Sequence, residues 1–496
     1  MLAAGRSERL AGVTNGRSKA LMQLGGVPLV ERAVRTLRDA GIDRVVVVVG
    51  YQGDQVAAAA RLAGGPVDVV HAERWEDGNA ASLAAAEPLV AGESSFLLMC
   101  GDHAFSSQAL PALVAASEPA VLVDPAPTPD AWGEGTRVSI REGRVTGFGK
   151  SLPDPAIDCG VFLLDARVFG AYRQTSAGGD HSLAGAVTRL GRSVPIRAVP
   201  LPPGAWWQDI DTPDDLRLAR TWLRQSLGKR SDGPVSRWLN RPISTRITMA
   251  ISPARIPPGA LSLFTALVGM WAAWSLSASR AVVGGIFVQA ASVLDGVDGE
   301  TARLQWRTSE RGALLDDLLD RMVDAAIVAG IGLWLWDDPS RLFRTLILGM
   351  TVAAWPLIHL AVRKPFQVFE VPQGAGRRPL LVILGSRDVR LAIVASISLF
   401  DQPWLALAAG MAAYCLSVLR RVPFMLARLR HGVAGPARAL AVRLHPLGLF
   451  IPAPLRRRPP VGPATPHQVG EAADRDLGEI GEEPEHQHGG DGLRSP

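Results

Sequence analysis

The chain has 496 residues, 48% of them hydrophobic, and a formal net charge of +5. This length suits two or three domains, and three cysteines without metal or redox spacing exclude a disulfide framework. The positive charge is concentrated near apolar segments, where it indicates membrane topology or anionic lipid rather than nucleic acid. We expect no cleavable signal peptide.

The uneven distribution of apolar residues predicts four parts. We expect a soluble α/β domain, a basic amphipathic linker beside a membrane, an all-α membrane domain, and a tail that is first basic and then disordered. The predicted bounds of these parts, in the same order, are 1–225, 226–258, 259–425 and 426–496.

Strands and helices alternate in the first part. An amphipathic helix is predicted over 29–40, and the β-branched run that follows at 44–49 is typical of a buried parallel strand. Further strands are predicted at 67–71 and 95–100, with a helix over 80–90 between them. This alternation indicates a doubly wound sheet, in which ligands bind beyond the carboxyl ends of the strands.

The start of this domain carries a candidate phosphate site. A glycine turn at Gly5 can present backbone N–H groups to phosphate. Arg9 and Lys19 follow it and would supply the positive charge that a triphosphate needs.

Acidic residues at two later points are candidates for metal binding. Asp102 follows directly on the strand predicted at 95–100, where a carboxylate can face a bound cation. Asp209 and Asp211 lie just before a helix that begins near Pro213, with Thr212 or Asp211 as its cap. Either Asp209 or Asp211 can point inward, and both alternatives stay open.

These segments together resemble the nucleotidyltransferases that join a nucleoside triphosphate to a sugar or alcohol phosphate. The opening motif is present, with Lys19-Ala20-Leu21 where the family has Lys-Pro-Leu. The resemblance implies triphosphate contacts from Gly5, Arg9 and Lys19, and Mg²⁺ ligands at Asp102 and Asp209. It also implies base contacts from Gly78, Asn79 and Ser82, a substrate-phosphate contact from Lys150, and an acceptor pocket at Gly160.

A basic linker and several apolar stretches follow. The linker has an apolar stripe at Trp238, Leu239, Ile243, Ile247 and Ile251, which is typical of a helix in a membrane interface. Apolar stretches approach the length needed to cross a bilayer, and they predict six crossings with the arginine-rich loops in the cytoplasm. These stretches are at about 260–278, 281–294, 318–336, 342–362, 389–400 and 403–419.

Four aspartates lie where two of the apolar helices meet. Asp295 and Asp298 share one helical face, and Asp316 and Asp320 share another. Four carboxylates facing one another require a cation, and hard oxygen ligands suit Mg²⁺, Mn²⁺ or Ca²⁺. Acidic residues at membrane depth are costly and usually functional.

The spacing of these residues resembles the signature of the CDP-alcohol phosphatidyltransferase family at every fixed position. The resemblance implies that Asp295, Asp298, Asp316 and Asp320 bind two metal ions. It also implies that Asp320 is the general base. Cytidine and its phosphates would be surrounded by Gly299, Ala302, Arg303 and Gly312.

Two arginines precede the fifth apolar stretch. Arg387 and Arg390 flank Asp388 and are suited to bidentate binding of an acceptor phosphate. Anchoring to lipid headgroups is the alternative.

The order of the two domains resembles the bifunctional inositol-1-phosphate cytidylyltransferases and di-myo-inositol-phosphate-phosphate synthases. That resemblance implies synthesis of CDP-inositol from CTP and inositol-1-phosphate with Mg²⁺ or Mn²⁺, then transfer to a second inositol phosphate. It further implies a homodimer through the membrane domain, whereas the arginine-rich loops predict an integral protein of the cell membrane with both active sites in the cytoplasm. Three alternatives stay open: a lipid acceptor, a different alcohol or sugar phosphate, and a first domain that only senses nucleotide.

Overall fold

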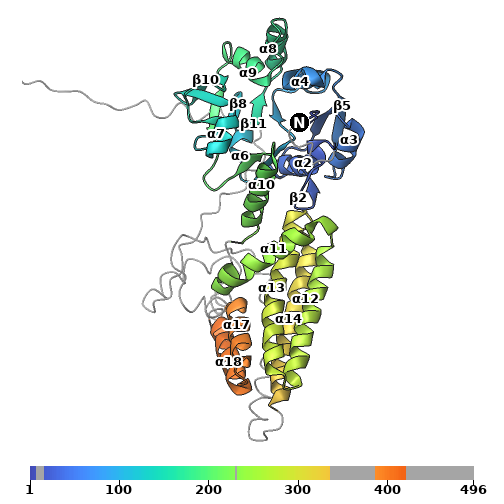
Figure 1. Ribbon diagram of the computed structural model, residues 1–496, viewed down its shortest axis with the longest axis vertical. Helices are drawn as coiled ribbons and strands as arrows, with labels where there is room; N and C mark the ends of the chain where they lie inside the picture. Colours follow the sequence, from blue (N-terminus) through green and yellow to red (C-terminus); the bar gives the residue numbers. More distant parts are fainter. Residues whose placement is uncertain (7–15, 230–231, 336–385, 420–496) are drawn as a thin grey trace, which may run out of the picture. The chain divides into compact units, whose positions relative to one another are not determined.

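The computed structural model describes residues 1–6, 16–229, 232–335 and 386–419 (Figure 1). An α/β domain comes first in the chain, and helices make up the later described residues. The predicted crossing at 342–362 and the tail lie outside the described residues, as does Arg9.

Three parallel strands form the first sheet of the α/β domain, in the order β1-β4-β5. Strand β4 consists of five valines, whose branched side chains pack well on both faces of a covered sheet. The predicted strands at 44–49 and 67–71 are confirmed. The bounds of the three strands are Leu2–Ala3, Val45–Val49 and Val67–His71.

A six-stranded mixed sheet follows, in the order β6-β11-β8-β12-β10-β9, and a single bridge from Leu2 to Cys100 joins it to β1. Strand β11 is antiparallel to both β6 and β8, so the doubly wound parallel pattern holds only for the first half of the domain. The strands are Phe96–Met99 (β6), Ala120–Asp124 (β8), Arg137–Arg141 (β9), Arg144–Gly149 (β10), Ile157–Leu164 (β11) and Arg197–Pro200 (β12).

Two short strand pairs complete the domain. Strand β13 (Trp207–Asp209) pairs antiparallel with β7 (His103–Phe105), and β2 (Gln23–Leu24) pairs with β3 (Val27–Pro28). The first of these pairs matters for the site, because it places Asp209 opposite His103.

Helices cover the sheets and bury their apolar faces against them. The predicted helix at 29–40 is confirmed as α2, and the predicted helix at 80–90 is two consecutive helices, α4 and α5. Thr212 caps α10 in a capping box with Asp215, which decides between the two predicted caps. The helices are Leu29–Asp39 (α2), Gly53–Arg61 (α3), Asn79–Ala85 (α4), Glu87–Val90 (α5), Pro111–Val114 (α6), Pro129–Glu134 (α7), Arg167–Ser176 (α8), Leu183–Gly191 (α9) and Pro213–Ser226 (α10), with 3₁₀ turns at Lys19–Leu21 and Trp75–Asp77.

The linker forms a π-helical turn (Ser236–Asn240) that continues into α11 (Arg241–Ile251) and a 3₁₀ turn (Ser252–Ala254). Trp238, Leu239 and Ile243 are exposed, Trp238 to 82%, whereas Ser244 and Thr248 are buried. The predicted location of this helix in a membrane interface stays a prediction.

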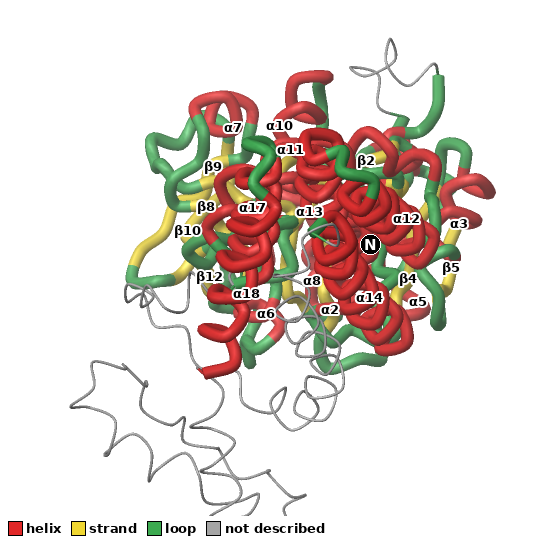
Figure 2. The backbone as a smooth tube through the Cα atoms, turned by 90° about the horizontal axis from the view of Figure 1, so that it is seen from below, coloured by secondary structure: helices red, strands yellow, loops and turns green. Residues whose placement is uncertain are grey.

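Five helices follow within the described residues, and α12 packs against both α13 and α14 while α17 contacts α13 and α18 (Figure 2). Two of them, α12 and α13, are long and apolar enough to cross a membrane. The six predicted crossings are therefore supported only in part within the described residues, because α17 has 12 residues and α18 has 17. The helices are Pro258–Ser277 (α12), Ala281–Leu304 (α13), Glu310–Trp334 (α14), Arg387–Ser398 (α17) and Pro403–Leu419 (α18).

Candidate active sites

The first site is built around the amino group of Lys19. The Nζ atom lies 3.0 Å from Asp102, 3.1 Å from Asp209 and 2.6 Å from Asp211. Asp102 follows strand β6, and the pairing of β13 with β7 brings Asp209 to the same point. Residues far apart in the sequence therefore converge because of two strand ends and one 3₁₀ turn.

Lys19 is buried, with 4% of its surface exposed. Burial alone would lower the pKa of Lys19, but the carboxylates of Asp102, Asp209 and Asp211 outweigh burial and raise it. The lysine therefore stays protonated at any physiological pH and holds the three acids together.

The three carboxylates also fit a divalent cation. Asp102, Asp209 and Asp211 each offer an oxygen, and these oxygens lie within 4.8 Å of one another. Such a set of hard oxygen ligands suits Mg²⁺ or Mn²⁺. The structure brings Asp209 and Asp211 to the cluster together, so it does not choose between the two predicted alternatives.

His103 is a second cation beside this cluster. Its Nδ1 lies 2.9 Å from the carbonyl oxygen of Cys159, and its Nε2 lies 3.3 Å from Asp209. Burial alone would lower the pKa of His103, but the carboxylates of Asp209 and Asp102 raise it to about 10. The sequence alone assigns no role to this histidine, because its partner Asp209 is far away along the chain.

Gly160 makes room for that histidine. Its φ is +72°, and a Cβ atom at this position would clash with the His103 ring. The residue therefore has a packing role toward His103 in addition to the predicted role in the acceptor pocket.

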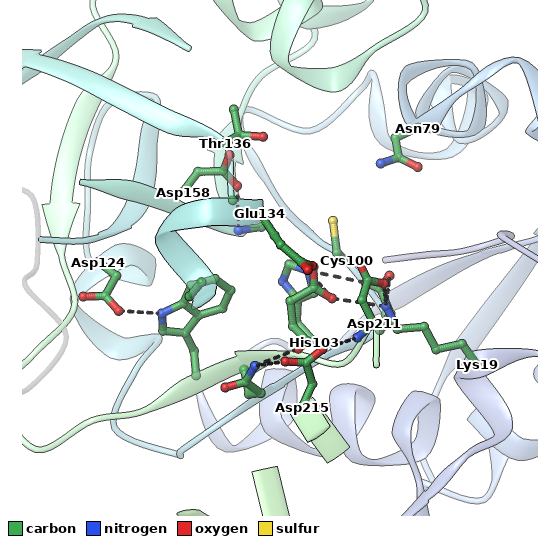
Figure 3. Close-up of a pocket in the computed structure, with 18 of the residues that line it drawn as sticks. Lys19, Asn79, Cys100, His103, Asp124, Glu134, Thr136, Asp158, Asp211 and Asp215 are labelled. Carbon is green, nitrogen blue, oxygen red and sulfur yellow. Dashed lines mark hydrogen bonds and ion pairs between the residues drawn. The ribbon is translucent and has the colours of Figure 1, made fainter. Parts of the chain in front are cut away.

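A cavity of about 1580 Å³ opens over the cluster (Figure 3). Every predicted site residue of the first domain that the structure describes lines this one cavity. They are Gly5, Lys19, Gly78, Asn79, Ser82, Asp102, Lys150, Gly160 and Asp209. The cavity therefore joins residues that the sequence analysis assigned separately to triphosphate, base and acceptor.

Further polar residues line the cavity that the sequence analysis did not single out. Figure 3 shows Glu134, Thr136 and Asp158 on the side formed by α7 and β11. Burial raises the pKa of Asp158 to about 6, although the backbone N–H of Gly160 donates to its carboxylate. These residues lie at the ends of elements with no distinctive spacing, so only the fold reveals them.

The second site lies between α13 and α14. Oxygens of Asp295, Asp316 and Asp320 come within 4.8 Å of one another, as the helical spacing predicts, and this donor set also fits a divalent cation. The fourth signature aspartate, Asp298, is 4% exposed and accepts hydrogen bonds from Ser262 and from the backbone of Gly299.

Arg387 reaches this cluster from the start of α17. Its guanidinium contacts Asp295 at 2.9 Å, Asp320 at 3.1 Å and Asp324 at 3.1 Å. Arg390 lies 3.6 Å from Asp324. The two arginines therefore stand beside the signature aspartates, whereas their role toward an acceptor phosphate stays a prediction.

The other signature residues have local contacts. Arg303 donates to the carbonyl oxygen of Leu227 at 2.8 Å, and Ala302 is buried. The backbone N–H of Gly312 donates to the cap residue Ser309 at 3.0 Å. A Cβ atom at Gly299 would lie 3.3 Å from the Arg303 guanidinium. The predicted contacts of these four residues with a nucleotide stay a prediction.

One residue inside the signature escaped the sequence analysis. Glu300 is fully buried in α13 and accepts hydrogen bonds from Arg241 at 2.5 Å, Ser244 at 2.7 Å and Thr248 at 2.7 Å. A buried carboxylate needs such partners. The sequence offered one indication of this role, an acidic residue within a largely apolar helix. The hydrogen bonds of Glu300 connect α11 to α13.

Comparison with known proteins matches each half of the chain to a family. Residues 1–138 match the MobA-like NTP transferase domain family, and residues 255–419 match the CDP-alcohol phosphatidyltransferase family. A bifunctional IPC transferase and DIPP synthase of Rubrobacter xylanophilus is 36% identical over 429 residues, which cover 85% of this chain and 95% of the relative. The chain belongs to this family.

Other bifunctional IPC transferases and DIPP synthases show the same extent of similarity. The Aquifex aeolicus protein is 32% identical over 79% of this chain and 90% of its own length. A solved inositol-1-phosphate CTP transferase from T. maritima is 26% identical, with a TM-score of 0.41 over 45% of this chain and 92% of that chain. Membership of the bifunctional family makes this chain an enzyme with a nucleotidyltransferase domain and a CDP-alcohol phosphotransferase domain.

Proposed function

We propose that the first domain makes CDP-inositol from CTP and inositol-1-phosphate. A phosphate oxygen of inositol-1-phosphate attacks the α-phosphorus of CTP, and diphosphate leaves. The observation that carries this proposal is the convergence of Lys19 with three carboxylates at the floor of one large cavity. Relatives named as IPC transferases support the choice of substrates.

The residues of the first domain divide the work. Lys19 and Arg9 would neutralise the departing diphosphate, and Gly5 would offer backbone N–H groups to the triphosphate. Asp102 with Asp209 or Asp211 would hold Mg²⁺ (or Mn²⁺), which when bound offsets the charge of the phosphates. Lys150 would bind the acceptor phosphate, and Gly78, Asn79 and Ser82 would adjoin the base.

We further propose that the second domain consumes this product. A hydroxyl group of a second inositol phosphate attacks the phosphorus that carries the inositol group, and CMP leaves. Asp320 would accept the proton of the hydroxyl group, and Asp295, Asp298 and Asp316 would complete the metal ligands. Arg387 and Arg390 would bind the acceptor phosphate, and Gly299, Ala302, Arg303 and Gly312 would surround CMP.

The proposal also covers the location of the enzyme in the membrane and its oligomeric state. Two apolar helices and the outward-facing stripe of the linker support an integral membrane protein. We propose six crossings, both active sites in the cytoplasm where CTP is available, contact with membrane lipid, and a homodimer through the membrane domain.

The test uses purified full-length protein in detergent with CTP, Mg²⁺ and a panel of alcohol phosphates, followed by mass spectrometry. Inositol-1-phosphate should give CDP-inositol and then a phosphorylated di-inositol product. If CDP-inositol accumulates until a lipid acceptor is added, the second half of the proposal fails. If no CDP compound forms with inositol-1-phosphate, the first half fails.

A further inference from the structure

The acidic row on α14 continues beyond the signature. Asp316, Asp320 and Asp324 are spaced four residues apart and so share one helical face. The family spacing ends at Asp320, and the group of close carboxylate oxygens that could hold a metal ion joins Asp295, Asp316 and Asp320 without Asp324. Asp324 therefore adjoins the candidate metal ligands and lies outside both the family spacing and this group of close oxygens.

Asp324 instead contacts three arginines. Arg387 donates to its Oδ1 atom at 3.1 Å, and Arg321 donates to its Oδ2 atom at 3.3 Å. The Arg390 guanidinium lies 3.6 Å from Oδ2. All four side chains are at most 20% exposed, so solvent screens these charges weakly.

Arg387 has two competing sets of partners. Its Nη atoms contact Asp295 and Asp320, which are candidate metal ligands, and its Nε atom contacts Asp324. A divalent cation on Asp295 and Asp320 would compete with the guanidinium for the same oxygens. When a cation displaces the Arg387 guanidinium from Asp295 and Asp320, the contact between Arg387 and Asp324 can remain.

We propose that Asp324 is a positioning residue that retains Arg387 and Arg390 beside the second active site. The inference rests on the proposed function, in which these arginines bind the acceptor phosphate. A carboxylate shared between them fixes the spacing of the two guanidinium groups and leaves their remaining N–H donors for a phosphate. It also limits how firmly Arg387 blocks the metal ligands.

The test compares Asp324→Asn with the wild type in detergent, with CDP-inositol supplied and inositol-1-phosphate varied. The loss of one charge-assisted contact should raise the KM for inositol-1-phosphate at least about tenfold, with kcat changed much less. The Mg²⁺ concentration for half-maximal rate should also rise, because Arg387 then binds Asp295 and Asp320 more firmly. Asp324→Glu should recover part of the loss.

A second measurement does not depend on turnover. Thermal unfolding is measured without CDP-inositol in protein that carries Asp102→Ala and Lys150→Ala, which removes the proposed Mg²⁺ and phosphate contacts of the first site. It should shift upward with Mg²⁺ and inositol-1-phosphate, and the further change Asp324→Asn should require more of each for the same shift. The matched control is Glu310→Gln, because Glu310 is an exposed acid at the start of the same helix, fourteen residues from Asp324.

The outcomes separate this inference from the proposed function. If the wild type forms no di-inositol product from CDP-inositol, the proposed function fails first. If the wild type forms it and Asp324→Asn keeps the wild-type KM and ligand-dependent shift, only the positioning role is overturned. A fall in kcat alone, or the same effect from Glu310→Gln, also overturns it.

Discussion

Both acidic sites hold several carboxylates close together, but different secondary-structure elements supply them. In the first domain, Asp102, Asp209 and Asp211 meet at Lys19 from strand ends that lie far apart along the chain. In the second, the aspartates come from adjacent helices, and Arg387 enters from a third. Each site places a cationic side chain of the chain itself among its carboxylates.

The two sites differ in how the carboxylates contact the cationic side chain, which is Lys19 in the first site and Arg387 in the second. Lys19 has a compact ammonium group that contacts three carboxylates of one cluster. Arg387 has a planar group whose separate nitrogens contact carboxylates inside and outside the candidate metal ligands. We therefore expect Lys19 to offset the negative charge of the phosphates in the first site. We expect Arg387 to bind the acceptor in the second site.

The largest expected effect comes from Asp320→Asn, which removes both the proposed base and a metal ligand. The second reaction should fall at least about 10³-fold, while CDP-inositol formation stays at the wild-type rate. Separate assays of CMP release and diphosphate release measure this. Glu310→Gln is the control on the same helix, because Glu310 is exposed, and loss of both reactions in Asp320→Asn would contradict two independent sites.

Asp102→Ala tests the other half of the comparison. It should abolish CTP-dependent diphosphate release, because the cluster loses a carboxylate that both Lys19 and a cation require. Supplied CDP-inositol should restore the di-inositol product in full. Asp54→Ala is the control, since the Asp54 side chain is fully exposed. A variant that CDP-inositol fails to rescue would mean that the first domain also supports the second reaction.

Lys19→Met asks whether the ammonium group acts on phosphate charge or only holds the carboxylates together. Removing a preorganised charge at a developing negative group should lower kcat of diphosphate release by about 10²–10³-fold. The second reaction, assayed with supplied CDP-inositol, should not change. A variant that loses thermal stability but keeps kcat would assign Lys19 a structural role only.

The smallest effect concerns stability and pH. Asp158 has a pKa near 6 in the folded protein, above its ordinary 3.8, so the folded state binds the additional proton between these values. Stability should therefore fall as pH rises from about 4 to 6, by no more than about 3 kcal/mol from this group. Asp158→Asn should flatten that slope in denaturant titrations at several pH values.

Asp165→Asn is the opposite control for that experiment. Hydrogen bonds from Arg167 hold the pKa of Asp165 below its ordinary value, so its contribution to stability is present at neutral pH and is lost as pH falls. A pH slope in Asp158→Asn that equals the wild-type slope would show that the Asp158 carboxyl group titrates normally.

Local patterns in the sequence predicted much of this molecule. The valine run of β4 and the helical spacing of Asp316 and Asp320 depend on near neighbours, so their structures followed directly. The antiparallel course of β11 did not, because strand direction depends on which strands pair across the chain. The six predicted crossings are supported only in part, because two helices among the described residues meet the length and apolarity of a span.

The same reason explains which site residues escaped prediction. Asp324 lies outside the family spacing, and its arginine partners are 63 or more residues away except Arg321. His103 acquires its role from Asp209 across a strand pair. Residue type and spacing identified the acids themselves, whereas tertiary contacts determine which cation each acid meets.

The linker helix also bears on the order in which the chain folds. Asp388, at the start of α17, accepts a hydrogen bond at 2.7 Å from the backbone N–H of Ser236, 152 residues earlier. No side chain of the linker itself caps the N-terminus of the helical turn at Ser236–Asn240. During synthesis, the first turn of the linker helix can therefore make this hydrogen bond only after Asp388 has been added to the chain, and the same holds for the contacts of the neighbouring Arg387 with the second site.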